Sequence, residues 1–343
     1  MFPDAATPFA VSVTIAESEG WHRTTLMPVQ PPWVTDATVL VVAGKGGVGS
    51  TTVGAAVALL AARAGADVLL ISVDGREGVG SLLGGPPLDS VDRVLLTVPR
   101  KGRVRGRTIP AQQAFADYLE LKGINGVLRK AASAAQLDSI AAATPGLEHL
   151  LVLGKIKELE RDRAADLIVV DAPPAGHAAA FLHSAASLQK VVTNGPVRVQ
   201  ADEVAEMLAN GARCQALLVT LPEETPVNET IELAYDLEET LGIALAPLII
   251  NGCWPDRAGL TLSVAAAARA QNVKLSSMNK VALEASAEFG RMRLDGQRRQ
   301  LARLTELLPL PRIVLPRLPT AHLGPTELGI LADALCAAVE NAS

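Results

Sequence analysis

A glycine-rich segment between an apolar stretch and an alanine-rich stretch is the feature that most restricts how this chain can fold. Residues 38–43 are mostly apolar, residues 44–49 contain four glycines, and residues 51–64 have a helical composition. Glycines in such a turn let consecutive backbone N–H groups point at one anion, and a helix N-terminus adds its positive end. The segment therefore predicts a strand, a phosphate-binding loop and a helix, although glycines also form tight turns that bind nothing.

Short apolar stretches alternate with helical stretches along the rest of the chain. Residues 167–170 are apolar throughout, as in strands that are covered by helices on both faces. The alternation predicts an α/β fold, a doubly wound, mostly parallel sheet of about seven or eight strands with helices on both faces. The expected strands are 38–43, 67–72, 93–98, 166–171, 215–221, 246–251 and 312–315. The expected helices are 51–64, 111–137, 145–163, 177–189, 227–241, 263–271, 280–307 and 325–339.

Composition excludes several classes of protein. The 343 residues are 49% hydrophobic and 20% charged, which suits a large core and not a disordered chain. The formal charge of -5 does not favour a nucleic-acid partner. Three separated cysteines without a CxxC pair exclude a zinc ribbon and a disulfide framework. We find neither a signal peptide nor an apolar run long enough for a transmembrane segment, so we expect a cytoplasmic protein.

The distribution of prolines suggests where the folded part begins. Residues 1–36 contain five prolines and no sustained hydrophobic period, which predicts a mobile N-terminal extension. Residues 37–343 are expected to form a single domain. Within it, a helical subregion at about 108–163 is expected to contact a client or partner.

The glycine-rich loop differs at one position from the standard phosphate-loop pattern GxxxxGKS/T. Gly44 and Gly49 have the right spacing, and Thr51 stands where a magnesium-binding hydroxyl belongs, but Ser50 replaces the lysine. The missing ammonium group normally contacts the β and γ phosphates, and a charge-assisted contact contributes about 1.5–3 kcal/mol. We therefore expect weak nucleotide binding and slow hydrolysis, with Lys45 on the same loop as a partial substitute.

Three segments together resemble a known family. Residues 44–52 resemble the deviant Walker A loop KGGVGKTT with one substitution, and residues 70–74 resemble a switch I segment. Residues 171–177, DAPPAGH, are similar to the switch II signature of the arsenite-pump (ArsA) ATPase family. The resemblance extends from residue 38 to about 335 and is strongest to single-domain actinobacterial members, the anion-transporting ATPases. Further matching segments are 144–148, 154–158 and 195–202.

This resemblance implies a P-loop NTPase fold of the SIMIBI type and a hydrolase that uses ATP or ADP with Mg²⁺. It also implies a homodimer, or a heterodimer with a paired ArsA-like ATPase, coupled to a protein client. The implied magnesium ligands are Thr51 and Asp171, and the implied catalytic residues are Asp74, Lys45 and Asp171, with Asp74 positioning water and Lys45 reaching the nucleotide of the other subunit. The implied nucleotide-binding residues are Gly44, Lys45, Gly46, Gly47, Val48, Gly49, Ser50, Thr51 and Thr52 in the loop, with Asn251 and Pro316 near adenine.

Alternatives remain open. Asp74 also fits a helix cap and Asn251 a routine turn. Because of Ser50, the chain fits either a slow ATPase switch or a degenerate nucleotide-sensing subunit with little or no ATPase activity.

A partitioning ATPase on DNA or membrane shares the deviant loop, but residues 326–340 carry no Lys or Arg to attach a membrane. The basic run 100–107 fits a solvated loop or a charge-protected edge strand. Scattered cysteines fit small core residues and give arsenite transport little support.

Overall fold

The computed structural model describes residues 32–73, 75, 78–99, 102–121 and 146–340. These residues form a nine-stranded sheet with the order β3-β4-β2-β5-β1-β6-β8-β9, and β7 lies beside β6. The strand pairs are parallel except β3 with β4, so the predicted doubly wound α/β fold is confirmed. The strands are β1 Val39–Gly44, β2 Asp67–Ser72, β3 Arg93–Thr97, β4 Arg103–Thr108, β5 Leu167–Asp171, β6 Cys214–Thr220, β7 Ala244–Leu245, β8 Leu248–Cys253 and β9 Arg312–Pro316.

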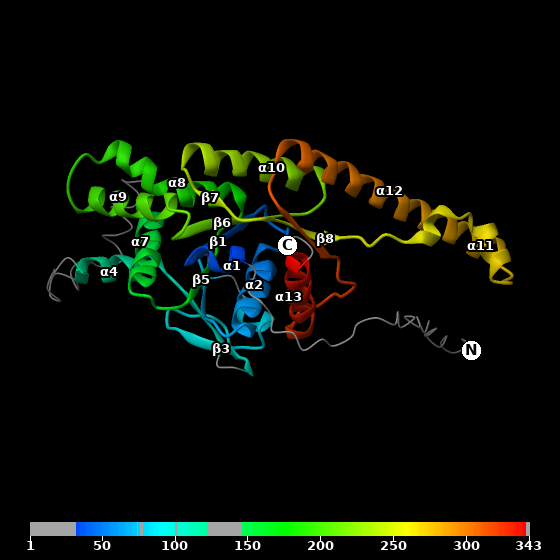
Figure 1. The fold of residues 1–343 in the computed structure, drawn as a ribbon, viewed down its shortest axis with the longest axis horizontal. Coiled ribbons are helices and arrows are strands. Elements are labelled where there is room, and N and C mark those ends of the chain that lie inside the picture. The colour runs from blue at the N-terminus through cyan, green and yellow to red at the C-terminus, as the bar shows by residue number, and fades with distance from the viewer. Residues whose placement is uncertain (1–31, 74, 76–77, 100–101, 122–145, 341–343) are drawn as a thin grey trace, which may run out of the picture.

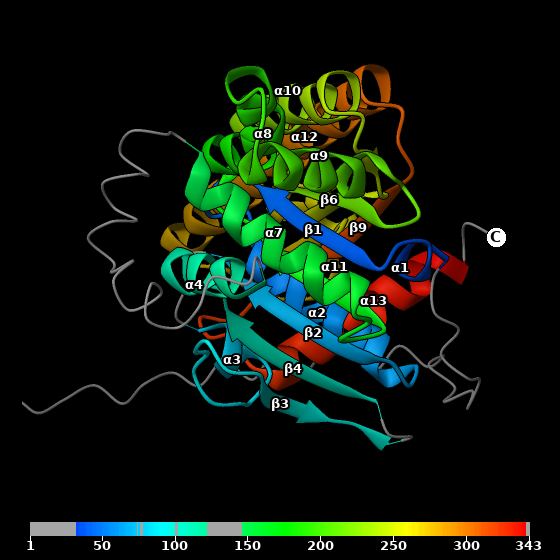
Figure 2. The ribbon, with the colours of Figure 1, turned by 90° about the vertical axis from the view of Figure 1, so that its left-hand side faces the viewer.

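Helices cover both faces of the sheet, as Figures 1 and 2 show. Helices α7 to α10 lie on one face, and α2 and α13 lie on the other. The helices are α1 Pro32–Thr35, α2 Ser50–Arg63, α3 Val79–Leu82, α4 Ala111–Leu121, α7 Leu147–Arg161, α8 Ala175–Val191, α9 Pro196–Ala209, α10 Glu224–Tyr235, α11 Val264–Ala270, α12 Ser277–Leu307 and α13 Pro325–Glu340. A π-helical turn, Asp236–Thr240, extends α10, and a 3-10 turn, Ala258–Thr261, precedes α11.

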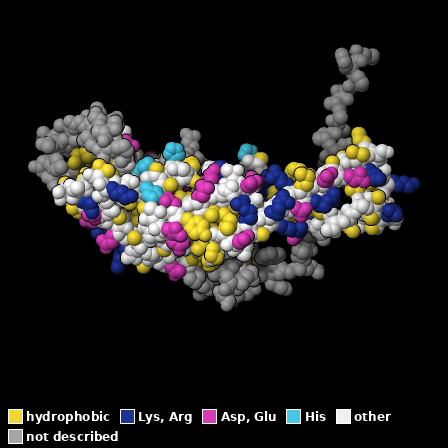
Figure 3. Space-filling view, turned by 90° about the horizontal axis from the view of Figure 1, so that it is seen from above, with side chains coloured by type: hydrophobic (Ala, Val, Ile, Leu, Met, Phe, Trp, Pro, Cys, Tyr) yellow, Lys and Arg dark blue, Asp and Glu magenta, His cyan; other side chains and the backbone are white. Residues whose placement is uncertain are grey.

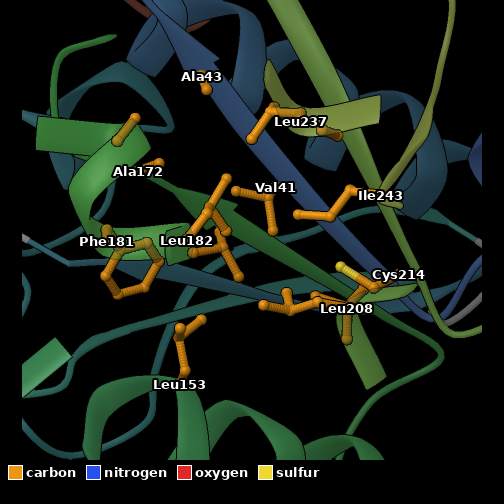
Figure 4. Close-up of a cluster of buried hydrophobic side chains, with 14 of the residues drawn as sticks. Val41, Ala43, Leu153, Ala172, Phe181, Leu182, Leu208, Cys214, Leu237 and Ile243 are labelled. Carbon is orange, nitrogen blue, oxygen red and sulfur yellow. The ribbon is translucent and has the colours of Figure 1, made fainter. Parts of the chain in front are cut away.

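The central strand β1 separates the core into two clusters of buried side chains. Val39, Val41 and Ala43 pack on the face of α7 to α10, and Leu40 and Val42 pack on the face of α2 and α13. Successive side chains of a strand point to opposite faces, so an uninterrupted apolar run can supply both clusters. Figure 4 shows the first cluster, in which Val41 lies among residues from several helices.

The basic run is a strand inside the sheet, which corrects both sequence interpretations of residues 103–108. Strand β4 pairs with β2 on one side and β3 on the other, so it is neither a solvated loop nor an edge strand. Its arginines are neutralised within the fold, since Arg105 binds Asp67 and Asp92, and Arg107 binds Asp92. These charges therefore serve the packing of the sheet.

Helix α9 is the main element absent from the sequence prediction. It begins at Pro196 after Gly195, and proline is favoured at a first helical position because its missing N–H has no partner there. Near the N-terminus, Trp33 and Val34 of α1 are already buried, while residues 1–31 lie outside the described part. The second half of the expected helix 111–137 also lies outside it, beyond the end of α4. Across the described ranges, no helix combines the length and hydrophobicity needed to cross a bilayer.

Candidate functional site

The glycine-rich loop joins the end of β1 to the start of α2, as the sequence predicts. Gly47 and Gly49 have φ angles of 89° and 87°, a left-handed conformation that favours glycine. A Cβ atom on Gly44 would lie 2.4 Å from the carbonyl oxygen of Val219 in β6. The loop is therefore shaped by backbone geometry and close packing that side chains would disrupt.

Strand pairing places a carboxylate beside this loop. Asp171, at the end of β5, pairs in register with Val42 of β1 and is only 2% exposed. The hydroxyl of Thr51, in the first turn of α2, donates to Asp171 Oδ2 at 2.9 Å and lies 3.1 Å from Oδ1. Two residues that are 120 positions apart in the sequence thus meet at the start of α2.

The donors at this point suit a hard cation. Mg²⁺ prefers oxygen ligands and is usually held by one or two carboxylates together with substrate phosphates and water. Thr51 and Asp171 supply a hydroxyl and a carboxylate, and the described residues contain no group of three or more His, Cys, Asp or Glu side chains suited to a metal. This hydroxyl and carboxylate therefore fit Mg²⁺ that is bound together with a phosphate group.

Ser50 and Lys45, two further polar positions of the loop, differ in their surroundings. Ser50 is 6% exposed, so a short hydroxyl occupies the position of the usual lysine inside the loop. Lys45 is partly exposed and forms an ion pair with Glu229 of α10. Glu229 is a residue that sequence reasoning missed. Its signal was present, because residues 223–239 contain seven acidic residues and no Lys or Arg.

Glu229 also lines an open cavity of about 470 Å³ between α8 and α10. The α8 wall begins at Ala175 and Gly176, which belong to the DAPPAGH segment, and the α10 wall is acidic. The remaining lining residues are Ala179, Glu232, Leu233 and Asp236. The segment that resembles switch II therefore borders a negatively charged hollow that also holds the partner of Lys45.

Asn251 reaches the loop from β8, and its Nδ2 atom donates to the carbonyl oxygen of Val48 at 2.8 Å. Pro316 ends β9 and pairs with Cys253 of β8. The next residues of the two segments also meet, since the Arg317 guanidinium lies 4.9 Å from the centre of the Trp254 ring. The backbone hydrogen bonds of the described residues include none between Pro316 and the loop. Asp74 lies outside the described residues, so its expected role stays a prediction.

Sequence comparisons with known proteins point to the same family that the glycine-rich loop resembles. A family profile described as anion-transporting ATPase (ArsA_ATPase) matches residues 37–80. ATPase BagA of Mycobacterium tuberculosis is 36% identical over 219 residues, which cover 61% of this chain and 63% of BagA. The arsenical pump-driving ATPase of Escherichia coli is 29% identical over 214 residues, 62% of this chain and 34% of that protein. ATPase GET3 of Malassezia globosa is 27% identical over 150 residues, 44% of this chain and 43% of that protein.

The resemblance to the ArsA family is confirmed. The match with BagA spans somewhat less than two thirds of either chain, and the family profile covers the loop, α2, β2 and the start of α3. The strongest sequence signal of this ArsA-like chain therefore coincides with the part of the fold that carries the glycine loop.

The cysteines of this ArsA-like chain do not form a thiol site. Cys214 on β6 and Cys253 on β8 are both buried, and Cys336 lies on α13, across the sheet. Burial raises the pKa of the Cys214 thiol to about 12 and that of Cys253 to about 11. Soft metals and metalloids bind thiolates, which burial disfavours here, so the expected role as small core residues is confirmed for these two.

Proposed function

We propose that this chain is an ArsA-like P-loop ATPase subunit that binds magnesium ATP or ADP at residues 44–52. The observation that carries the proposal is the contact between the Thr51 hydroxyl and the Asp171 carboxylate, 2.9 Å apart, at the mouth of a glycine loop. A strand, a glycine loop and the N-terminal turn of a helix form a site for phosphate groups. The Thr51 hydroxyl and the Asp171 carboxylate would then supply oxygen ligands to a cation bound beside those phosphates.

Each group of residues at the proposed site has a separate role. The backbone N–H groups of the loop, from Gly46 to Thr52, would hold the phosphate oxygens, while Thr51 and Asp171 would hold Mg²⁺, which offsets phosphate charge when bound. Asp74, after the second strand, would orient the attacking water. Asn251 and Pro316 would approach the base. Hydrolysis is expected to be slow, because Ser50 offers no ammonium group to the transferred phosphate.

The second candidate is a nucleotide-sensing regulatory subunit with little or no turnover. Two observations favour it, the burial of Ser50 within the loop and the engagement of Lys45 by Glu229. With Ser50 in place and Lys45 paired to an acid, neither position supplies a free cation to the γ-phosphate. A subunit of this kind would bind nucleotide and signal its presence to a partner that hydrolyses ATP.

The proposal includes an assembly. Lys45 would leave Glu229 and reach the nucleotide of a second subunit, either another copy or a paired ArsA-like ATPase in the cytoplasm. Nucleotide binding would then switch the pair and act on a protein client. Residues 108–163 would be the contact region of a single domain, and the residues before α1 would be an extension. Sedimentation with and without nucleotide tests the assembly. A monomer under all conditions, also with the paired protein present, contradicts the role of Lys45.

Calorimetric titration with magnesium ATP and magnesium ADP tests the binding site itself. We expect measurable but weak binding for a P-loop protein, because the glycine frame is intact while one charge contact of about 1.5–3 kcal/mol is missing. Thr51→Ala should weaken binding further in the presence of Mg²⁺, and Ser263→Ala, a change at the cap of α11, serves as the matched control. No heat and no thermal shift with millimolar nucleotide would contradict the proposal.

Restoring the lysine separates the two candidate functions. Ser50→Lys should raise kcat/KM by about tenfold or more, because one recovered charge contact is worth about 1.5–3 kcal/mol. The double change Ser50→Lys with Asp74→Asn should lose this gain. Steady-state phosphate release is measured for the three proteins. If Ser50→Lys binds ATP tightly and still shows no turnover, the regulatory function is the correct one.

A further inference from the structure

Asn251 is held against the phosphate loop by a local irregularity of β8. The pairing of β8 with β9 shifts register between Ile250 and Cys253, and Gly252 takes a φ angle of 65°. Such bulges bend a strand and redirect a side chain, and they are frequent beside functional sites. Here the side chain next to the bulge is the one that contacts the loop. The residue that contacts the loop therefore lies within the irregular part of β8.

The contact between Asn251 and the loop is close at two points. Its Nδ2 atom donates to Val48 O at 2.8 Å, and the same atom would lie 2.6 Å from a Cβ atom on residue 49. The amide therefore occupies the space that a side chain at Gly49 would need. Val48 O accepts from one N–H of the amide, which leaves the second N–H and the Oδ1 atom for another partner.

We propose that Asn251 is a positioning residue that fixes the conformation of the phosphate loop through the Val48 carbonyl. This inference rests on the proposed function, and it goes beyond the expected contact of Asn251 with adenine. In the expected role, Asn251 contributes only to recognition of the base. In the role inferred here, it contributes to binding of any ligand that carries the phosphate chain, with or without a base.

Two probes distinguish these roles, magnesium ATP and magnesium tripolyphosphate, which has the phosphate chain but no base. In the full-length Asn251→Ala variant, the loop loses its anchor, so we expect the dissociation constants of both probes to rise by a similar factor, about five- to tenfold for one hydrogen bond. Asn251→Asp, which keeps the size but cannot donate when ionised, should weaken tripolyphosphate at least as much. Asn279→Ala, on the exposed surface of α12, is the matched control and should change neither constant.

Affinity and melting temperature are measured together for every variant. A fall in tripolyphosphate affinity at an unchanged melting temperature supports a positioning role, because a purely structural role would lower the melting temperature and leave the folded protein's affinity intact. If both variants bind tripolyphosphate like the wild type and only ATP is weakened, Asn251 reads the base alone and the inference is wrong. A wild-type chain that binds neither probe contradicts the proposed function and this inference together.

Discussion

Helices α2 and α12 show two ways in which this chain stabilises a helix. Of the 14 residues of α2, 11 are buried, whereas only Leu294 and Leu304 are buried among the 31 residues of α12. Helix α2 has no side-chain cap, and its first turn faces the glycine loop. Ser276 caps α12 and Ser263 caps α11, because each hydroxyl oxygen accepts a hydrogen bond from a backbone N–H in the first turn of its helix. Both exposed helices therefore satisfy an N-terminal N–H group with a side chain of their own segment.

The difference separates a well-buried body from an exposed arm, which is defined here as residues 254–307. In Figure 1, α12 runs outward from the sheet and α11 lies at its far end. Lys and Arg side chains gather along this segment in the view from above (Figure 3). The body holds the loop in place through burial, whereas the arm has side-chain caps, exposed ion pairs such as Lys280 with Glu284, and contacts between α11 and α12. Substitutions in the body should therefore lower the free energy of unfolding much more than substitutions in the arm.

The largest expected effect compares the same substitution in both helices. Leu60 of α2 is 2% exposed and Leu283 of α12 is 46% exposed. Leu60→Ala should lower the free energy of unfolding by about 2–5 kcal/mol, because it removes buried methyl groups and leaves a cavity. Leu283→Ala should cost less than about 1 kcal/mol. Urea denaturation measures both. Equal losses would show that the arm is as tightly integrated as the body.

An intermediate effect concerns acid stability. Burial alone would raise the pKa of Asp67, but hydrogen bonds from Arg103 and Arg105 outweigh it and lower this pKa. A carboxyl group with a lowered pKa stabilises the fold above its ordinary pKa, and that contribution is lost as the pH falls through the folded value. Asp67→Asn should therefore cost about 2 kcal/mol at pH 7, a difference that shrinks toward pH 3.

The arm offers a matched ion pair for this experiment. Asp256 pairs with Arg298, but their side chains are 80% and 61% exposed. Because exposed pairs contribute little, Asp256→Asn should change the free energy of unfolding by less than about 0.5 kcal/mol at either pH. Urea denaturation at pH 7 and pH 3 measures both variants. A pH-independent loss in Asp67→Asn would mean that its charge is not the cause.

The sequence predicted most features that depend on local pattern, with α9 as an exception, and missed features that depend on contacts between distant segments. All seven expected strands and the loop of residues 44–49 were readable, because apolar runs and glycines report local structure. The basic residues 103–108 were misread, since the aspartates that neutralise them come from separate segments. The acidic stretch that contains Glu229 was visible in the sequence, but only the folded chain shows which of its acids meets Lys45.

The smallest expected effect concerns the exposed apolar side chains of α12. Met278, Val281, Phe289 and Met292 recur at helical spacing, and each is more than half exposed, with Met278 at 78%. The Arg293 guanidinium lies 5.4 Å from the centre of the Phe289 ring. Apolar area that stays in water adds nothing to folding, so Met278→Ser and Met292→Ser together should change the free energy of unfolding by less than about 0.5 kcal/mol. The same measurement on Val57→Ser in α2, a fully buried position, should show a loss of several-fold that size. A loss above about 1 kcal/mol in the α12 double variant would show that the stripe is covered within the chain, and the contrast between body and arm would then fail at its clearest point.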